Sequence, residues 1–275
     1  MPTEEETSGK LSVSEISVSF GGITALDGVS LDVSPREVLG VIGPNGAGKT
    51  TLFNVICGFV APASGTIRWR GQPLDRIRPH RLASLGIART LQGVGLFSDL
   101  TVHENVMVGA QRFRRSGVMG AMLARPGADR DERALSERAL AALEKVGCHD
   151  VAQARPGQLP YAAQKRVALA RALACEPDLL LLDEPAGGLD SEEMSALADT
   201  IRSLGSSIAV MLVDHHMDLV TSVCDRMVVL DFGRVIAAGD PDTVRQDPRV
   251  LEAYLGREAE AGDTAAASEK TDAPR

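Results

Sequence analysis

Residues 43–50 are the stretch whose residue types and spacing most directly indicate chemistry. They read Gly-Pro-Asn-Gly-Ala-Gly-Lys-Thr and match the phosphate-binding pattern G-x-x-x-x-G-K-[ST]. Glycines let the backbone wrap closely around phosphate oxygens, and the amides at the start of the following helix point toward them. Lys49 would reach the β- and γ-phosphates, and the hydroxyl of Thr50 would hold Mg²⁺.

The flanks of this loop agree with that interpretation. Residues 38–42 form a short apolar run rich in β-branched side chains, typical of a buried parallel strand, and a helical pattern from Thr51 ends at Gly58. The alternative is a glycine-rich turn followed by a chance Lys-Thr pair, and these flanks disfavour it. The sequence therefore predicts a nucleoside triphosphate site lined by Gly43, Pro44, Asn45, Gly46, Ala47, Gly48, Lys49, Thr50 and Thr51.

Two adjacent acids form the second candidate site. Asp183 and Glu184 end the apolar run Leu179–Leu182. Burying unpaired carboxylates at the tip of a strand costs free energy, so such a pair indicates a functional role. If this strand lies beside the phosphate loop in a parallel sheet, Asp183 can bind Mg²⁺ through water while Glu184 polarises an attacking water.

Other strand ends also carry side chains of interest. The apolar run 208–213 is tipped by Asp214, His215 and His216. Phe20 ends an alternating stretch just before Gly21 and Gly22. The pattern is equally compatible with a ring that stacks on a purine base and with a core residue.

Composition limits the classes of protein that fit. The 275 residues are 44% hydrophobic and 24% charged, as in an ordinary globular protein with a sizeable core. A net charge of −8 argues against a general nucleic-acid binder. The four scattered cysteines are expected to be reduced core residues, and no apolar run is long enough to span a membrane. The acidic start of the chain does not resemble a signal peptide.

The remaining pattern predicts the elements that position these side chains. Alternating or continuous apolar runs predict strands at 11–20, 29–33, 38–42, 64–71, 87–92, 178–185, 208–213, 226–231 and 235–238. Helices are expected at 51–57, 79–85, 102–108, 131–146, 159–173, 191–204 with Ser191 as its cap, 217–223 and, in two pieces, 242–255. A capping box is expected at Thr101 and Glu104. We expect an α/β protein with a parallel-sheet core and a small antiparallel β-layer.

The order of these motifs resembles that of ATP-binding subunits of ABC transporters. The resemblance covers roughly residues 11–256 and rests on Gly43–Thr50, Gln92, Leu159–Gln164, Leu182–Pro185, Gly187–Asp190 and Asp214–His215. It implies the P-loop ABC ATPase fold with a helical lobe at about 93–175. Residues 1–10 and 257–275 are expected to be disordered.

The resemblance also assigns roles. It implies that Phe20 stacks on adenine, that Gln92 links Mg²⁺ to a membrane partner, and that Glu184 is the general base. Asp190 would cross the seam between two ATPase subunits. His215 would contact the γ-phosphate, with His216 as its competitor, because His215 directly follows the strand end as the family's histidine does.

One motif departs from the family pattern. The family signature begins Leu-Ser-x-Gly, whereas this chain has Leu159, Pro160, Tyr161 and Ala162, followed at Gln164 by a matching glutamine. The family's serine and glycine hold the γ-phosphate bound to the opposite subunit. Losing one or two such hydrogen bonds, at about 1.5–3 kcal/mol each, would slow that site by about tenfold to a few hundredfold.

Subfamily features imply the partners. Phe20-Gly21-Gly22, Arg89–Gln92, Leu100–Val106 and Val250–Gly256 resemble subunits that drive branched-chain amino-acid importers. The alternatives within the family are an ATPase of a related importer for urea or other amides and an ATPase of lipid or lipopolysaccharide export. Implied partners are a second ATP-binding subunit, identical or related, membrane permeases and an extracytoplasmic substrate-binding protein. The chain would then lie at the cytoplasmic face of the inner membrane. Alternatives are a soluble ABC ATPase acting on ribosomes or DNA, and a regulatory subunit that scarcely hydrolyses ATP.

Overall fold

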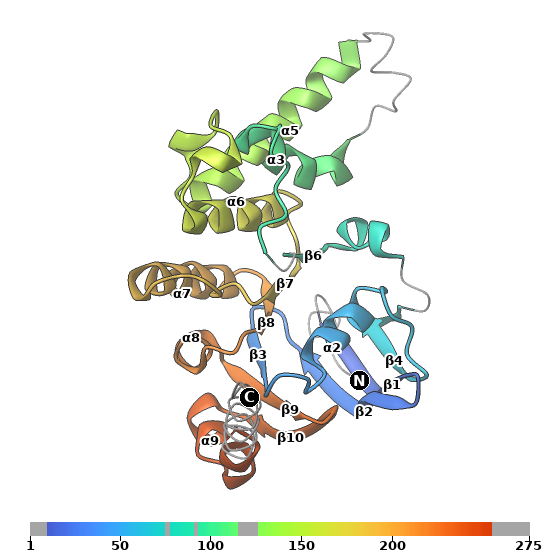
Figure 1. The fold of residues 1–275 in the computed structure, drawn as a ribbon. Helices are drawn as coiled ribbons and strands as arrows, with labels where there is room; N and C mark the ends of the chain where they lie inside the picture. The colour runs from blue at the N-terminus through green and yellow to red at the C-terminus, as the bar shows by residue number, and fades with distance from the viewer. Residues whose placement is uncertain (1–9, 75–77, 91–92, 115–125, 255–275) are drawn as a thin grey trace, which may run out of the picture.

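Within the part of the chain that the structure describes, the strands form two sheets, and both position the motifs (Figure 1). The structure, a computed structural model, describes residues 10–74, 78–90, 93–114 and 126–254. An antiparallel sheet has the order β2-β1-β4-β5, and a larger sheet has the order β10-β9-β3-β8-β7-β6. The small sheet consists of β1 (Leu11–Phe20), β2 (Ile23–Val33), β4 (Ser64–Trp69) and β5 (Gln72–Pro73). The large sheet consists of β3 (Val38–Ile42), β6 (Ile87–Arg89), β7 (Leu179–Asp183), β8 (Ala209–Val213), β9 (Arg226–Asp231) and β10 (Arg234–Gly239).

Neighbouring strands of the large sheet run parallel except for β10, which pairs antiparallel with β9. The helices are α2 (Lys49–Ile56), α3 (Val102–Gly109), α5 (Pro126–Lys145), α6 (Tyr161–Leu173), α7 (Ser191–Gly205), α8 (Met217–Val223) and α9 (Pro241–Arg245). Figure 1 shows α3, α5 and α6 grouped at one end of the molecule, next to the edge that carries β6 and β7.

Both faces of the large sheet are buried, which explains why its central strands are continuously apolar. Alternate residues point to opposite sides. Leu180 and Leu182 join a core shared with the helices of the 102–173 region and with α7 and α8. Leu179 and Leu181 join a second core, shared with α2 and the antiparallel sheet. The motifs therefore lie at the ends of strands that are fixed from both sides.

The described residues include no helix with the length and apolarity needed to cross a membrane. The four cysteines are buried and free, as the sequence predicts.

Several elements differ from the sequence-based expectation. The segment expected as one helix over 79–85 is two short 3-10 turns, Pro79–Arg81 and Ala83–Leu85. The strand expected to reach residue 92 ends at Arg89. Ser191 is not the cap of α7: Asp190 is, because its side chain accepts from the Glu193 amide while the Glu193 side chain accepts from the Asp190 amide.

The acid-tipped strand is not a direct neighbour of the loop strand either. β8 lies between β3 and β7. The predicted antiparallel layer, the parallel-sheet core and the capping box of Thr101 and Glu104 are confirmed.

Candidate functional site

The phosphate loop connects β3 to α2, and its backbone requires glycine at two positions. Gly43 has a φ of 148° and a Cβ there would lie 2.1 Å from the carbonyl oxygen of Leu230. Gly48 has a φ of 104° and immediately precedes α2. The ammonium of Lys49, which is buried, donates to the carbonyl oxygens of Gly43 at 2.6 Å and Pro44 at 2.9 Å. The loop thus curls around the same cationic group that would meet phosphate oxygens.

Strand register brings the acids to the same edge of the sheet as this loop. Val213 of β8 pairs with Val41 of β3 on one side and with Asp183 of β7 on the other. Since adjacent strands lie about 4.8 Å apart, the Asp183 backbone lies about 10 Å from that of β3. The carboxylate of Asp183 is buried, and its Oδ2 accepts from the guanidinium of Arg89 at 2.7 Å.

Glu184 follows at a sharp turn of the chain. Its φ of 47° lies in the left-handed region, which non-glycine residues seldom adopt. Its amide donates to the carbonyl oxygen of Val213 at 2.8 Å, which fixes the turn. Glu184 is half-buried and lines a cavity between α6, α7 and the end of β7.

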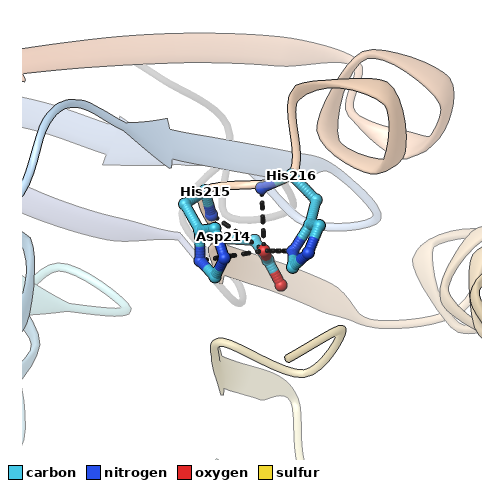
Figure 2. A group of neighbouring side chains, drawn as sticks. All are labelled: Asp214, His215 and His216. Atoms are coloured by element: carbon cyan, nitrogen blue, oxygen red, sulfur yellow. Dashed lines mark hydrogen bonds and ion pairs between the residues drawn. The ribbon is translucent and has the colours of Figure 1, made fainter. Parts of the chain in front are cut away.

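The third strand end is organised by the carboxylate of Asp214, which has no exposed surface. Figure 2 shows it between the rings of His215 and His216. Oδ1 accepts from the amides of both histidines, at 2.8 and 3.0 Å, and lies 2.7 Å from Nδ1 of His216. Oδ2 accepts from the amide of Ala186 at 3.0 Å. Asp214 therefore ties the segment after Glu184 to the paired histidines.

The two histidines differ in freedom. Nδ1 of His215 is 3.7 Å from Asp214 and its side chain is 53% exposed, against 29% for His216. The exposed imidazole is available for a ligand, while the other is held. The ligand atoms of the three residues lie within 4.8 Å of one another, close enough for a metal ion. Both oxygens of Asp214 already accept hydrogen bonds, which favours a structural role over metal binding: the carboxylate acts as a clasp that holds the segments after β7 and β8 together.

The altered signature forms the start of α6. Pro160 is the N-cap and offers no side-chain hydrogen bond, while Tyr161 is exposed. The side-chain amide of Gln164 donates to the Leu159 carbonyl at 3.0 Å. Ala162, half-buried, lines a cavity of about 280 Å³ between α6, α7 and the end of β7.

Lys165 connects this helix to the acids. Its ammonium donates to the carbonyl oxygens of Pro185 at 2.8 Å and Glu184 at 3.3 Å. Burial lowers the pKa of Lys165, while the nearby carboxylates of Asp214 and Glu184 raise it. The signature helix is thereby attached to the loop that carries Glu184.

The remaining predicted residues are placed as follows. Phe20, at the end of β1, is 51% exposed, which fits a stacking ring better than a core residue. Asp190 is exposed at the start of α7. Thr50 is exposed and Thr51 half-buried at the start of α2. Gln92 lies outside the described residues.

Sequence reasoning missed three residues at this site. Arg89 has a signal in the Arg89–Gln92 motif but no role that the sequence indicates, and Lys165 has no signal because cations are common; only the fold shows that both lie next to the acids. Tyr254 is the third: a hydrogen bond with the backbone of Gly43 lowers its pKa, while burial, the larger effect, raises it. For Tyr254 the signal was its place in the motif at the end of the chain.

Together these groups can perform one kind of chemistry. A cationic loop at a helix N-terminus binds anionic oxygens, a carboxylate next to water accepts a proton, and an exposed imidazole donates to a developing charge. This combination suits the hydrolysis of a phosphoanhydride.

Family models match two parts of the chain. A model described as ABC transporter matches residues 26–187. A model described as branched-chain amino acid ATP-binding cassette transporter matches residues 234–260, which include Tyr254.

Individual proteins resemble the whole chain. The high-affinity branched-chain amino acid transport ATP-binding protein BraF of Pseudomonas aeruginosa is 39% identical over 248 residues, 90% of this chain and 97% of BraF. The ADP conformation of MJ1267, an ATP-binding cassette of an ABC transporter, superposes with a TM-score of 0.78 at 29% identity, covering 90% of this chain and 98% of that one. A dimeric structure of the bacterial ABC transporter cassette MJ0796 gives a TM-score of 0.70 at 25% identity, covering 84% and 98%.

Proposed function

The chain belongs to the ATP-binding proteins of ABC transporters, and on this premise we propose that it hydrolyses ATP to drive a branched-chain amino-acid importer. It has the P-loop ABC ATPase fold. The observation that carries the mechanism is the row Val41–Val213–Asp183, which brings the phosphate loop, the acids and the histidines to one edge of the sheet. The C-terminal match at 234–260 supports the choice of substrate class.

The phosphate loop and Phe20 would bind ATP. The ammonium of Lys49 would exchange the carbonyl oxygens of Gly43 and Pro44 for the β- and γ-phosphate oxygens. The amides of residues 46–51 surround the phosphates at the start of α2. The exposed ring of Phe20 stacks on the adenine.

The residues present fit Mg²⁺, which prefers hard oxygen ligands. The exposed hydroxyl of Thr50, the carboxylate of Asp183 and the side chain of Gln92 would hold it, the carboxylate through water. When bound, Mg²⁺ neutralises charge that develops on the β- and γ-phosphate oxygens.

Glu184 is the general base of the reaction. Its carboxylate accepts a proton from a water whose oxygen attacks the γ-phosphorus, and the bond from that phosphorus to the bridging oxygen breaks as ADP leaves with the electron pair. His215, the more exposed of the two histidines, donates to a γ-phosphate oxygen. His216, held by Asp214, keeps the segment in place.

Two ATP-binding subunits would close around two ATP molecules, as the dimer of MJ0796 supports. The segment Leu159–Gln164 of one subunit then faces the γ-phosphate bound to the other, and Asp190 lies at the seam. With Pro160 and Ala162 in place of serine and glycine, the amides at the start of α6 are the remaining donors.

The partners are inferred from the family. Closure drives membrane permeases, which receive the amino acid from an extracytoplasmic binding protein. The chain works at the cytoplasmic face of the membrane through its permeases.

The test is ATP turnover by the purified chain next to Glu184→Gln, with the association state followed by light scattering. We expect slow hydrolysis by the wild type, and an ATP-bound dimer without hydrolysis for the variant. Hydrolysis by Glu184→Gln at the wild-type rate would refute the assignment of the base. A wild type that binds ATP without dimerising would instead point to a related partner with an intact signature.

A further inference from the structure

Arg89 lies half-buried next to the carboxylate that is proposed to hold Mg²⁺. One guanidinium nitrogen donates to Oδ2 of Asp183 at 2.7 Å and another to Oδ1 of Asn54 at 2.8 Å. Only 12% of the Arg89 side chain and 2% of the Asp183 side chain are exposed. The ion pair is therefore screened little by water, and its charges act at nearly full strength on neighbouring groups.

Aromatic rings fix the guanidinium in this position. Its carbon lies 5.6 Å from the centre of the Phe53 ring and 5.9 Å from that of Phe59. These contacts, with the hydrogen bond to Asn54 on α2, hold the cation independently of Asp183. Asn54 and Phe53 belong to α2, the helix that follows the phosphate loop. The guanidinium therefore contacts both α2 and the end of β7, which carries Asp183.

We propose that Arg89 is a positioning residue that sets the Mg²⁺ affinity of the site by neutralising Asp183. A divalent cation requires the negative charge of that carboxylate. A fixed guanidinium at 2.7 Å offsets one unit of that charge and repels the incoming ion. The site consequently binds Mg²⁺ less tightly than the same carboxylate without Arg89, which favours release of the ion with ADP after each turnover.

This inference rests on the proposed function, because it takes Asp183 as the Mg²⁺-binding acid. The test is Mg²⁺ titration of the full chain with a fluorescent ADP, using Arg89→Gln and Arg89→Lys. Gln removes the charge and keeps a hydrogen-bond donor toward Asp183, whereas Lys keeps the charge. Folding of each variant is checked by its thermal unfolding midpoint.

We expect Arg89→Gln to lower the Mg²⁺ concentration for half-saturation by about tenfold, and Arg89→Lys to stay within about twofold of wild type. Nucleotide binding in EDTA should be the same for both variants and the wild type. The matched control is Arg70→Gln. Arg70 pairs at 2.6 Å with Asp178, which precedes the opposite end of the same strand, and both side chains are about two-fifths exposed.

Unchanged or weaker Mg²⁺ binding by a folded Arg89→Gln variant would overturn the inference. A tenfold change in the Mg²⁺ concentration for half-saturation of Arg89→Lys would also overturn it. The Lys variant therefore provides the test if the Gln variant does not fold. If the wild type binds nucleotide identically with and without Mg²⁺, the proposed metal site itself fails, and that result is visible before any Arg89 variant is made.

Discussion

Replacing Asp214 with asparagine tests whether one buried carboxylate holds the catalytic segments together. The carboxylate accepts at least four hydrogen bonds, of which the donor from Ala186 uses Oδ2 and the donors from the two histidines use Oδ1. Asparagine has the same shape, but its amide nitrogen donates. If the side-chain oxygen of asparagine faces the histidines, its side-chain nitrogen faces the backbone amide of Ala186. Two hydrogen-bond donors then face each other, and the Ala186 amide has lost its acceptor.

The cost follows from these contacts. A buried donor left without an acceptor costs about 1–3 kcal/mol, and the bonds at the other oxygen weaken when they lose charge assistance. Lys165 also loses a compensating negative charge, while the variant no longer has to bury a carboxylate. We expect the free energy of unfolding to fall by about 2–3 kcal/mol.

The measurement is chemical denaturation followed by the fluorescence of Trp69, the single tryptophan, which is buried in the antiparallel sheet. ATP turnover of the folded variant should drop at least about tenfold, because both Ala186 and His215 lose their common anchor. Nucleotide affinity should persist, since the Lys49 contacts do not involve Asp214.

The control is Asp218→Asn, which changes an exposed acid four residues further on. It should alter unfolding by less than about 0.5 kcal/mol. If Asp214→Asn matches that control in stability, or hydrolyses ATP at the wild-type rate, the clasp does not position the catalytic segments.

Three further predictions concern the signature, the C-terminal tyrosine and a buried thiol. Pro160→Ser with Ala162→Gly should raise ATP turnover of the assembled complex by about tenfold or more, and no increase would show that the altered signature costs nothing. Tyr254→Phe should weaken ATP binding about two- to tenfold in equilibrium titrations by removing the hydroxyl next to Gly43, without a matching loss of stability. Burial raises the pKa of Cys175 from 9.0 to about 11, so the folded state holds that proton more tightly. The stability this provides is present below pH 9 and is lost as the pH rises through about 11. The unfolding midpoint of the wild type should therefore fall over that range more than that of Cys175→Ala.

The sequence predicts most of the fold because its signals are local. The continuous apolar runs at β3, β7 and β8 are long enough to indicate buried parallel strands, and the glycines of the phosphate loop limit what can follow β3. The cap of α7 was missed for a local reason too. Asp190 and Ser191 are both good caps, and the reciprocal bond with Glu193 decides between them.

Long-range pairing is the part that local patterns do not contain. Arg89 and Asp183 lie 94 positions apart, and they meet because β6 pairs with β7. In the same way, nothing near Lys165 in the sequence indicates that its ammonium lies against the carbonyl oxygen of Pro185. The motifs therefore predict the residues proposed to react, whereas the charged groups that contact those residues become visible only in the fold.

We propose that the altered signature at the start of α6 can still act in an ATP-bound dimer. A serine at the position of Pro160 would cap the helix within its own chain, since serine side chains accept from the first-turn amides at about 1 kcal/mol. Proline provides no such bond, and the cap residue of α6 makes no side-chain hydrogen bond to the first-turn amides. A γ-phosphate on the facing subunit would then supply an acceptor for these amides, and part of the binding energy lost with the serine would be recovered because no side-chain cap has to be broken. Pro160→Ser alone should accordingly add more free energy to the folding of the isolated chain than to the association of the ATP-bound dimer, so that Ala162→Gly provides most of the turnover gain expected for the double variant. The opposite order in melting and light-scattering measurements would mean that the hydroxyl acts on the partner's phosphate.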